Sequence, residues 1–272
     1  MRGKLHLTAY TILALFAIFA LFPFIWVIFC SLKNTSEIFS GVFFPTTIRI
    51  LNYPNSWRIA ELGQSFINSI VVTFFVIAIN LIISSMAGYS FAKLKLRQYP
   101  NLFYIYISCL AIPGQATAIA LFLQLKSMGL QNNIWGLIIV LAGGGSVFGT
   151  FMLRNFFRDI SDSYAESAEI DGASIVQVFT KIYIPMAKPA ITTLLVFVSM
   201  GAWNDYYLSL LLLKDDNLWT IPLAISSIKS LAVTQFGYAF AATVMSFLPI
   251  IVIYFIFNQK FIEGIALGGE KA

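Results

Sequence analysis

Long apolar runs separated by short polar connections dominate this chain of 272 residues. Five runs contain no Asp, Glu, Lys or Arg over 27 to 31 consecutive residues. Their charged borders are Lys4 and Lys33, Glu61 and Lys93, Arg97 and Lys126, Lys126 and Arg154, and Lys229 and Lys260. A sixth run, from Pro189 to Leu213, is interrupted only by Asn204-Asp205. Since a helix of about 20 residues crosses the apolar core of a bilayer, each run is long enough to span a membrane.

The runs therefore predict an all-α membrane protein with six transmembrane helices in a single domain, residues 1–272. Backbone groups in lipid must be paired within their own segment, and the short alternating segments of a β-barrel are absent from the sequence. The first apolar run, from about Leu7 to Leu32, is longer than the core of a signal peptide and has no small-x-small cleavage site after it. We expect it to be retained as a helix.

Composition excludes several other classes of protein. Hydrophobic residues make up 59% of the chain and charged residues only 11%, against about 25% charged in soluble domains. The single histidine, His6, and the two cysteines, Cys30 and Cys109, cannot supply a zinc site or a plausible Ser-His-Asp triad. We therefore expect no catalytic residues, no metal and no cofactor on this chain. The net charge of +5 comes without a basic cluster interleaved with aromatics, so no nucleic-acid partner is expected.

The positive residues instead indicate how the chain is oriented. If the N-terminus is cytoplasmic, the inner connections carry 11 of the 17 Lys and Arg residues, and the outer connections carry six. An excess of Lys and Arg marks the cytoplasmic side. Both termini are predicted to be cytoplasmic.

The segment from Arg154 to Lys188 is the one large inner connection, with nine charges in 35 residues. Ser163 and Glu166 have the spacing of a capping box, which predicts a helix through Ile170 that ends at Gly172. Apolar residues at intervals of three or four predict a second short helix that ends at Pro185, before Pro189 opens the next span. Two short helices meeting at a small corner form a knob suited to a groove on another protein. The alternative is a helix pair lying on the lipid headgroups.

Within this connection the sequence resembles a known signature. The sequence here reads Glu166-Ser167-Ala168, three residues, Gly172, nine residues and then Ile182-x-Ile184-Pro185. This pattern resembles the E-A-A-x3-G-x9-I-x-L-P motif. That motif belongs to permease subunits of binding-protein-dependent ABC importers. The departures are Ser167, Ile184, and Ser161 where many relatives carry Pro. Three further segments are similar to the carbohydrate-importer branch, the permease of the MalG type: Glu169–Ser174, Trp203–Tyr206, and the tail Phe261–Gly264 with Gly268-Gly269.

The resemblance implies the type I ABC importer permease fold, with residues 161–185 as a cytoplasmic coupling loop between helices 4 and 5. It implies four kinds of partner: a second permease that is a different chain, two copies of a cytoplasmic ABC ATPase that binds ATP and Mg, an extracytoplasmic solute-binding protein, and a sugar. The location implied is a bacterial or archaeal inner membrane. The sequence itself has no G-x-x-x-x-G-K-[ST] loop, so ATP hydrolysis is expected on another chain. The coupling residues it implies are Glu166, Ser167, Ala168, Asp171, Gly172, Ala173, Ser174, Ile182 and Pro185.

Three local hypotheses remain open at this point. Glu166 either offers its carboxylate to a basic group of the ATPase or only completes the capping box. Trp203, Asn204, Asp205 and Tyr206 either line the sugar path or lie at the outer interface, with Asp205 paired to a neighbouring helix. Gly145-x-x-x-Gly149 permits close helix packing, within the bundle or against the second permease.

A gradient-driven transporter or channel is the alternative function. Such proteins usually bury several ionisable groups near the midplane, whereas this sequence has one acid within a predicted span.

Overall fold

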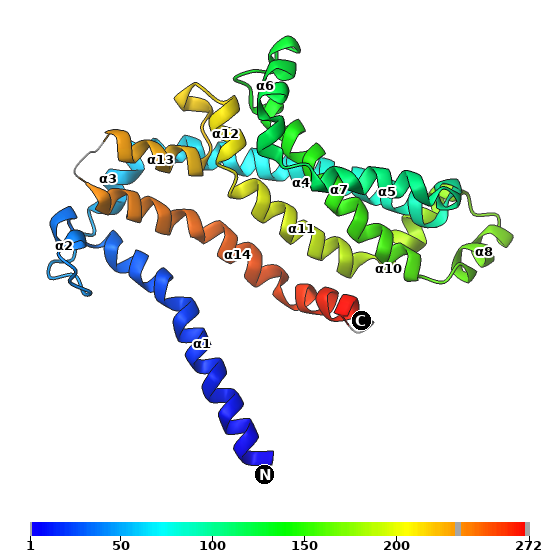
Figure 1. Cartoon of the computed structure of the whole chain (residues 1–272), viewed down its shortest axis with the longest axis horizontal. Coiled ribbons are helices and arrows are strands. Elements are labelled where there is room, and N and C mark those ends of the chain that lie inside the picture. Colours follow the sequence, from blue (N-terminus) through cyan, green and yellow to red (C-terminus); the bar gives the residue numbers. More distant parts are fainter. Residues whose placement is uncertain (1, 232–234, 270–272) are drawn as a thin grey trace. The chain divides into compact units, whose positions relative to one another are not determined.

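The structure is a computed structural model that describes the backbone of residues 2–231 and 235–269 and the side chains of residues 10–228 and 235–256. Over these ranges the chain is helical and contains no strand (Figure 1). The predicted side-chain features at His6 and in the tail Phe261–Gly269 lie outside the described residues. The chain forms two compact units, residues 1–63 with 221–249, and residues 64–220 with 250–272.

Four described helices are long and apolar enough to cross a membrane, or six if each of two bent helix pairs counts as one span. The four unbroken ones are α1 (Arg2–Ser31), α4 (Leu62–Lys93), α7 (Ile134–Asp159) and α14 (Phe236–Gly269). The predicted all-helical membrane fold is therefore confirmed, and six is the upper count for the part of the chain that the structure describes.

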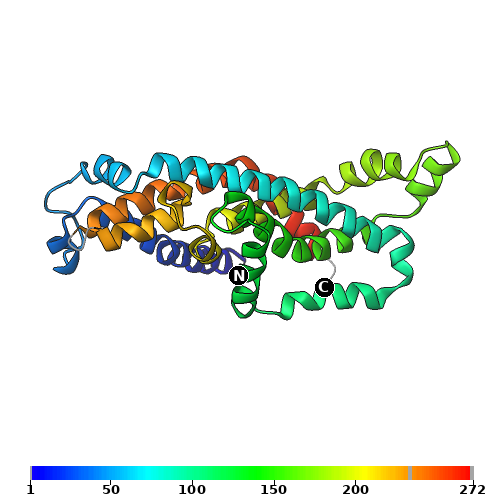
Figure 2. The same cartoon turned by 90° about the horizontal axis from the view of Figure 1, so that it is seen from above.

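The third predicted span is a bent pair rather than one helix. Its first arm is α5 (Pro100–Ser108) with the 3-10 turn η2 (Cys109–Ala111), and its second arm is η3 (Gly114–Thr117) with α6 (Ala118–Ser127). The two arms meet at 87°. Ile112 is extended because the ring of Pro113 disfavours a helical residue before it, and Pro113 has no N–H to continue the helix. Figure 2 shows the two green arms and the corner between them.

The predicted span from Pro189 to Leu213, fifth in chain order, is also shorter than the sequence suggested. Helix α11 (Lys188–Trp203) starts with Pro189 in its first turn and ends before Asn204-Asp205, and a separate helix α12 (Tyr207–Leu212) follows. The prediction of one helix from Pro189 to Leu213 is therefore wrong, because the two polar residues break it. The connection onward contains η5 (Asp216–Leu218).

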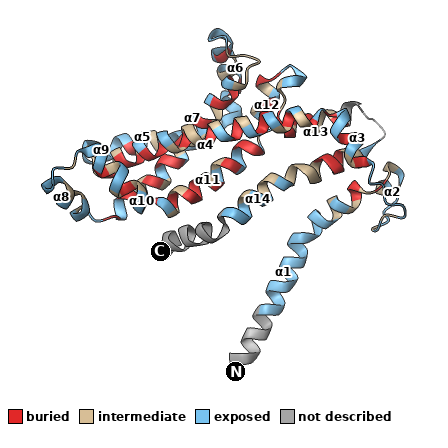
Figure 3. Cartoon of the chain, turned by 180° about the vertical axis from the view of Figure 1, so that it is seen from behind, coloured by how far each residue is buried: buried red, intermediate tan, exposed pale blue. Residues whose placement is uncertain are grey.

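The longer unit is organised around α4, α7 and α11. The buried residues of α7 recur along one side of the helix, from Gly136 to Phe157 (Figure 3). Asn80 and Ser84 of α4 are both fully buried and bond to α7: the Asn80 amide donates to the carbonyl of Ala142 (3.1 Å) and the Ser84 hydroxyl to that of Ser146 (3.4 Å). Since lipid offers no polar partner, such bonds hold the two helices together.

The other unit contains α1, α2 (Thr35–Phe39), α3 (Asn52–Ile59), α13 (Ile221–Leu231) and the first part of α14. Its connection after α1 is fixed by Lys33, whose side chain is fully buried and whose ammonium donates to the carbonyls of Val42 (2.5 Å) and Phe43 (2.8 Å). The Asn52 amide donates to the carbonyl of Ser31, the last residue of α1, and to that of Lys33, two residues after it.

Candidate functional site

The inner connection between α7 and α11 folds into two helical limbs. The first limb is α8 (Ser163–Ile170). The second contains α9 (Ile175–Val178), a π-helical turn η4 (Phe179–Tyr183) and α10 (Ile184–Met186). Figure 2 shows α8 at one end of the unit that contains α4 and α7. The two predicted helices therefore exist, although the second is irregular.

The corner between the limbs depends on Gly172, which has φ of +83° as the sequence predicted. Its N–H donates to the carbonyl of Glu169 (3.0 Å), and the N–H of Ala173 donates to that of Ala168 (2.9 Å). This pair of bonds is a Schellman motif, in which a left-handed residue closes a helix end. Ala168 and Ala173 both pack against the core of the unit, so the motif brings the two small residues together.

An open hollow of about 380 Å³ lies at this corner. Ala168 and the residues Asp171 to Ala173 line one side of it, and Gln177, Lys181 and Ile182 line the other. Five of the nine predicted coupling residues thus line one concave surface, and Glu166, Ser167, Ser174 and Pro185 are not among its lining residues.

The capping prediction for the first limb is wrong in its location. Ser163 is the first residue of α8, the residue before it makes no side-chain cap, and Glu166 completes no capping box. The capping box is found instead at the start of α9, where Ser174 and Gln177 bond each other's backbone amides. No capping-box hydrogen bond is formed at the start of α8, so the interpretation of Glu166 as a capping residue is contradicted.

The second limb departs from a regular helix just before Pro185. In a regular α-helix the proline ring would clash with the carbonyl four residues earlier, so the backbone takes a wider π turn. The predicted end at Pro185 is therefore wrong by one residue, because α10 continues to Met186. Val178 and Tyr183, five residues apart, both enter the buried core, where three- or four-residue spacing had been expected.

The buried aromatic side chains attach this limb to the spans. Tyr183 is 1% exposed, and its ring centroid lies 5.0 Å from that of Tyr89 on α4 and 6.1 Å from that of Phe157 on α7. Phe179 lies 4.9 Å from Tyr89. The aromatic cluster of Tyr89, Phe157, Phe179 and Tyr183 therefore fixes the second limb to both helices.

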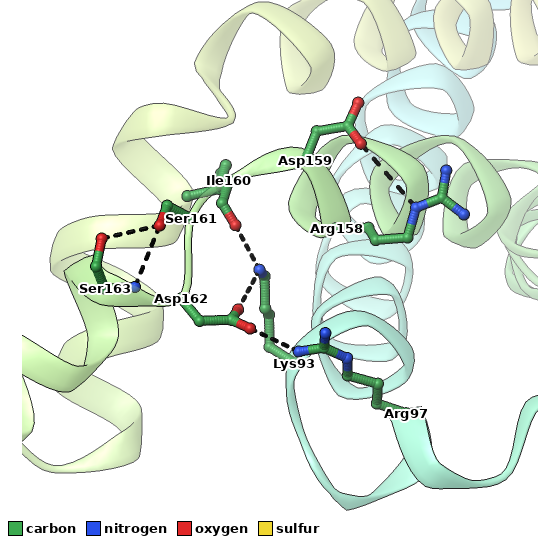
Figure 4. A network of polar contacts seen from close by, with 8 residues as sticks. All are labelled: Lys93, Arg97, Arg158, Asp159, Ile160, Ser161, Asp162 and Ser163. Atoms are coloured by element: carbon green, nitrogen blue, oxygen red, sulfur yellow. Dashed lines mark hydrogen bonds and ion pairs between the residues drawn. The ribbon is translucent and has the colours of Figure 1, made fainter.

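Three charged residues connect the first limb to the end of α4 (Figure 4). Asp162 accepts from the ammonium of Lys93 (2.5 Å) and from the guanidinium of Arg97 (2.7 Å), which lies in the turn η1 (Lys95–Gln98). The hydrogen bond from Lys93, and to a smaller extent the one from Arg97, holds the pKa of Asp162 below its ordinary value. The ionised carboxylate therefore stabilises the fold at any pH above about 4, the pKa of an Asp in the unfolded chain. This stabilisation is lost as the pH falls through the lower pKa that Asp162 has in the folded chain. At neutral pH Asp162 is ionised.

Sequence reasoning missed this network. Asp162 and Lys93 are 69 positions apart, and neither belongs to the signature. The only signal in the sequence was that Lys93 and Arg97 flank the end of an apolar run.

Asp205 is placed differently from the sequence expectation. It lies in the break between α11 and α12, where its carboxylate accepts from the amide (2.9 Å) and the hydroxyl (3.0 Å) of Ser209. Its described bonds are thus to the helix that follows it in sequence, rather than across to another span. Trp203 is 3% exposed and contacts Phe66 edge-on.

The other residues at this break reach the surface. Asn204 is exposed and its amide donates to the carbonyl of Met200 (2.9 Å), while Tyr206 and Tyr207 are 42% and 41% exposed.

The glycines of α7 face two directions. A Cβ on Gly149 would lie 2.3 Å from Ser84 Oγ, and one on Gly145 would lie 2.9 Å from Asn80 Nδ2, so these two glycines lie against α4. Gly143 and Gly144 instead line a hollow of about 450 Å³ with Thr117. Among the residues that the structure describes, no group of three or more His, Cys, Asp or Glu could hold a metal ion.

Helices that are long and apolar enough to cross a membrane, joined by one charged helical loop, fit a membrane transport subunit. Residues 85–265 match the family described as binding-protein-dependent transport system inner membrane component. The chain belongs to this family and is a multi-pass permease subunit of an ABC importer.

Relatives and solved structures agree with this assignment. The multiple sugar-binding transport system permease protein MsmG of Streptococcus mutans is 31% identical, with 96% of each chain covered. The diacetylchitobiose uptake system permease protein NgcG of Streptomyces coelicolor is 29% identical over 96% of this chain and 87% of its own length. A bacterial ABC transporter involved in the import of the acidic polysaccharide alginate has a chain of the same fold, with a TM-score of 0.79, 26% identity, and 95% and 97% of the two chains covered.

Proposed function

We propose that this chain forms half of the path of a carbohydrate importer and receives the ATPase stroke through residues 161–185. The relatives named above carry sugars in their names, which supports a carbohydrate as the solute. The proposed partners are a second, different permease chain, two copies of a cytoplasmic ABC ATPase that holds ATP and Mg, and an extracytoplasmic solute-binding protein. This chain itself is proposed to carry no catalytic step.

The observation that carries the proposal is that no residue of α8 is buried. Ile170 is 87% exposed, Tyr164 is 53% exposed, and the Glu166 carboxylate makes no hydrogen bond or ion pair with the described residues. An apolar side chain as exposed as that of Ile170 is available to a partner surface. The hollow at the Gly172 corner lies in the same loop. A basic group of the ATPase is the partner proposed for Glu166.

Replacing Glu166 by Gln tests this role, because Gln keeps the shape and removes the charge. We expect less ATPase to co-purify with Glu166→Gln and the solute-stimulated ATPase rate to fall, since a hydrogen bond to a charged group is stronger than a neutral one. Asp216→Asn removes an equally exposed carboxylate from the connection after α12 and should leave both measurements unchanged. Wild-type ATPase retention and coupled uptake in Glu166→Gln would refute the ionic role.

The carbohydrate assignment has a separate test. The binding protein that co-purifies with the complex should gain thermal stability with one class of sugar, and uptake into proteoliposomes should follow the same order of sugars. Stabilisation by amino acids or metal ions alone would contradict it.

The break at Asn204–Tyr207 is proposed as the part of this chain that contacts the solute. Exposed tyrosines can stack on sugar faces, and Asn204 and Asp205 offer polar atoms beside them. Trp203, which is buried, would support the break from behind.

Both termini are proposed to be cytoplasmic, as the distribution of Lys and Arg indicates. A cysteine introduced at Asp171 should then resist an impermeant maleimide in intact cells. Rapid labelling from outside would show that the orientation is the opposite of the one proposed.

A further inference from the structure

The start of α8 uses Asp162 in an unusual way. An Asp at the position before a helix normally turns its carboxylate back onto the free amides of the first turn. Asp162 makes no such bond and has helical backbone angles, and the amide of Ser163 donates to the hydroxyl of Ser161 (3.3 Å). The carboxylate is turned instead toward Lys93 and Arg97 (Figure 4). A local preference is thus replaced by a contact with another element, which is typical of a functional position.

Lys93 sits at the centre of this contact. Its side chain is only 6% exposed, and its ammonium bonds both Asp162 and the carbonyl of Ile160 (2.5 Å). The same ammonium lies 5.6 Å from the ring centroid of Tyr183. Lys93 of α4 therefore contacts both the segment before the first limb and Tyr183, the side chain that attaches the second limb to the spans.

The two attachments lie on one face of α4. Tyr89 and Lys93 are four residues apart, which places them one above the other on a helix. Tyr89 contacts Phe179 and Tyr183 of the second limb, and Lys93 contacts Asp162 at the start of the first. The loop is therefore held to the last turns of α4 at two points, one aromatic and one ionic.

We propose that Asp162, held by Lys93 and Arg97, is the positioning residue that makes α4 follow the movement of α8. The inference rests on the proposed function, in which an ATPase moves this loop. With both attachments present, a displacement of α8 must be shared by α4. Without the ionic one, α8 can pivot about the Gly172 corner and the aromatic cluster, and the ATPase cycle proceeds without moving the span.

The test is the number of solute molecules transported per ATP hydrolysed by the whole complex in proteoliposomes with its binding protein. For Asp162→Asn we expect this ratio to fall about fivefold, the effect of an interaction worth about 1 kcal/mol, while ATPase co-purification stays at the wild-type level. Asp162→Glu keeps the charge and should restore most of the ratio. Asp216→Asn removes an exposed carboxylate from the connection after α12, outside this loop, and should match the wild type.

Arg97→Gln provides a second variant, because Arg97 is more than half exposed and its loss does not open the core. It should lower the ratio in the same direction, and combining it with Asp162→Asn should add little, since residues of one network are not additive. An unchanged ratio in both single variants would overturn the inference. So would loss of bound ATPase in Asp162→Asn, which would make Asp162 a docking contact.

These outcomes separate the inference from the proposed function. If Glu166→Gln uncouples transport and Asp162→Asn does not, only the positioning role fails. If Glu166→Gln, Asp162→Asn and Arg97→Gln all leave transport and ATPase binding intact, the coupling role of the loop fails as well.

Discussion

Adding one methyl group at Gly149 should disrupt the contact between α4 and α7. A Cβ there would lie 2.3 Å from Ser84 Oγ, 2.9 Å from Ser84 Cβ and 3.1 Å from Leu194 Cδ2. Rotating the Ser84 side chain moves its hydroxyl but not its Cβ, which is fixed to the backbone. Ordinary contacts begin at 3.4 Å, so the helices would have to separate by about 0.5 Å (3.4 minus 2.9) at this level.

The magnitude follows from two contributions. Overpacking of this kind costs about 1–3 kcal/mol, and loss of the Ser84 hydrogen bond to Ser146 costs about 1 kcal/mol more. Alanine is also a better helix former than glycine, but the same gain occurs in Gly144→Ala, where a Cβ meets nothing within 4 Å. The difference between the two variants therefore isolates the contact and should be about 2–4 kcal/mol.

The assay is thermal unfolding of the detergent-purified complex for Gly149→Ala and its matched control, Gly144→Ala. We expect Gly149→Ala to unfold at a temperature lower by on the order of 10 °C. Adding Ser84→Gly removes the two nearest of these three atoms, leaves only Leu194 Cδ2, and should restore part of the loss. Equal unfolding temperatures for the two alanine variants would refute the close packing of α4 against Gly149.

Two further substitutions test the break after α11 and the corner of the loop. Asp205→Asn keeps the oxygen that accepts from Ser209, so its unfolding temperature should match the wild type, whereas Asp205→Ala should cost about 1 kcal/mol. Reduced uptake in the stable Asn variant would support a solute role for the carboxylate, and unchanged uptake in the Ala variant would remove it. Gly172→Ala meets no atom within 4 Å, so only its φ of +83° resists and the corner should weaken by about 1–2 kcal/mol. Less ATPase should then co-purify than with Gly172→Asn, which tolerates this backbone better; equal retention would show that the corner angle does not matter.

Features encoded over short stretches of sequence were predictable. The apolar runs mark the spans because lipid requires long uncharged segments, and Gly172 marks the corner because other residues resist its backbone angles. The close approach of α7 at Gly149 was expected from spacing alone, although its partner, Ser84, could not be identified. A small residue indicates room for a neighbour but not which neighbour takes it.

Features that depend on competition between local and distant contacts were not predictable. Ser163 and Glu166 have the right spacing for a capping box, yet the turn from Ser161 to Ser163 starts the helix in its place. The bend at Ile112-Pro113 could have been expected from the proline, but the absence of charge over the whole run concealed it. Pairing between Lys93 and Asp162 appears only when α4 and α7 have packed.

The π turn before Pro185 has a consequence for how this loop can change length. It contains one residue more than an α-helical turn would, and the buried series Tyr183, Ala187, Ala190 and Leu194 continues from it into α11. Each residue of a helix rotates the next by about 100°. Helix α11 begins only after a bend of 76°, so deleting a single residue in the π turn would rotate Tyr183 away from the aromatic cluster. Natural variation in this loop should therefore proceed by substitution, and insertions or deletions should gather in the outer connections instead.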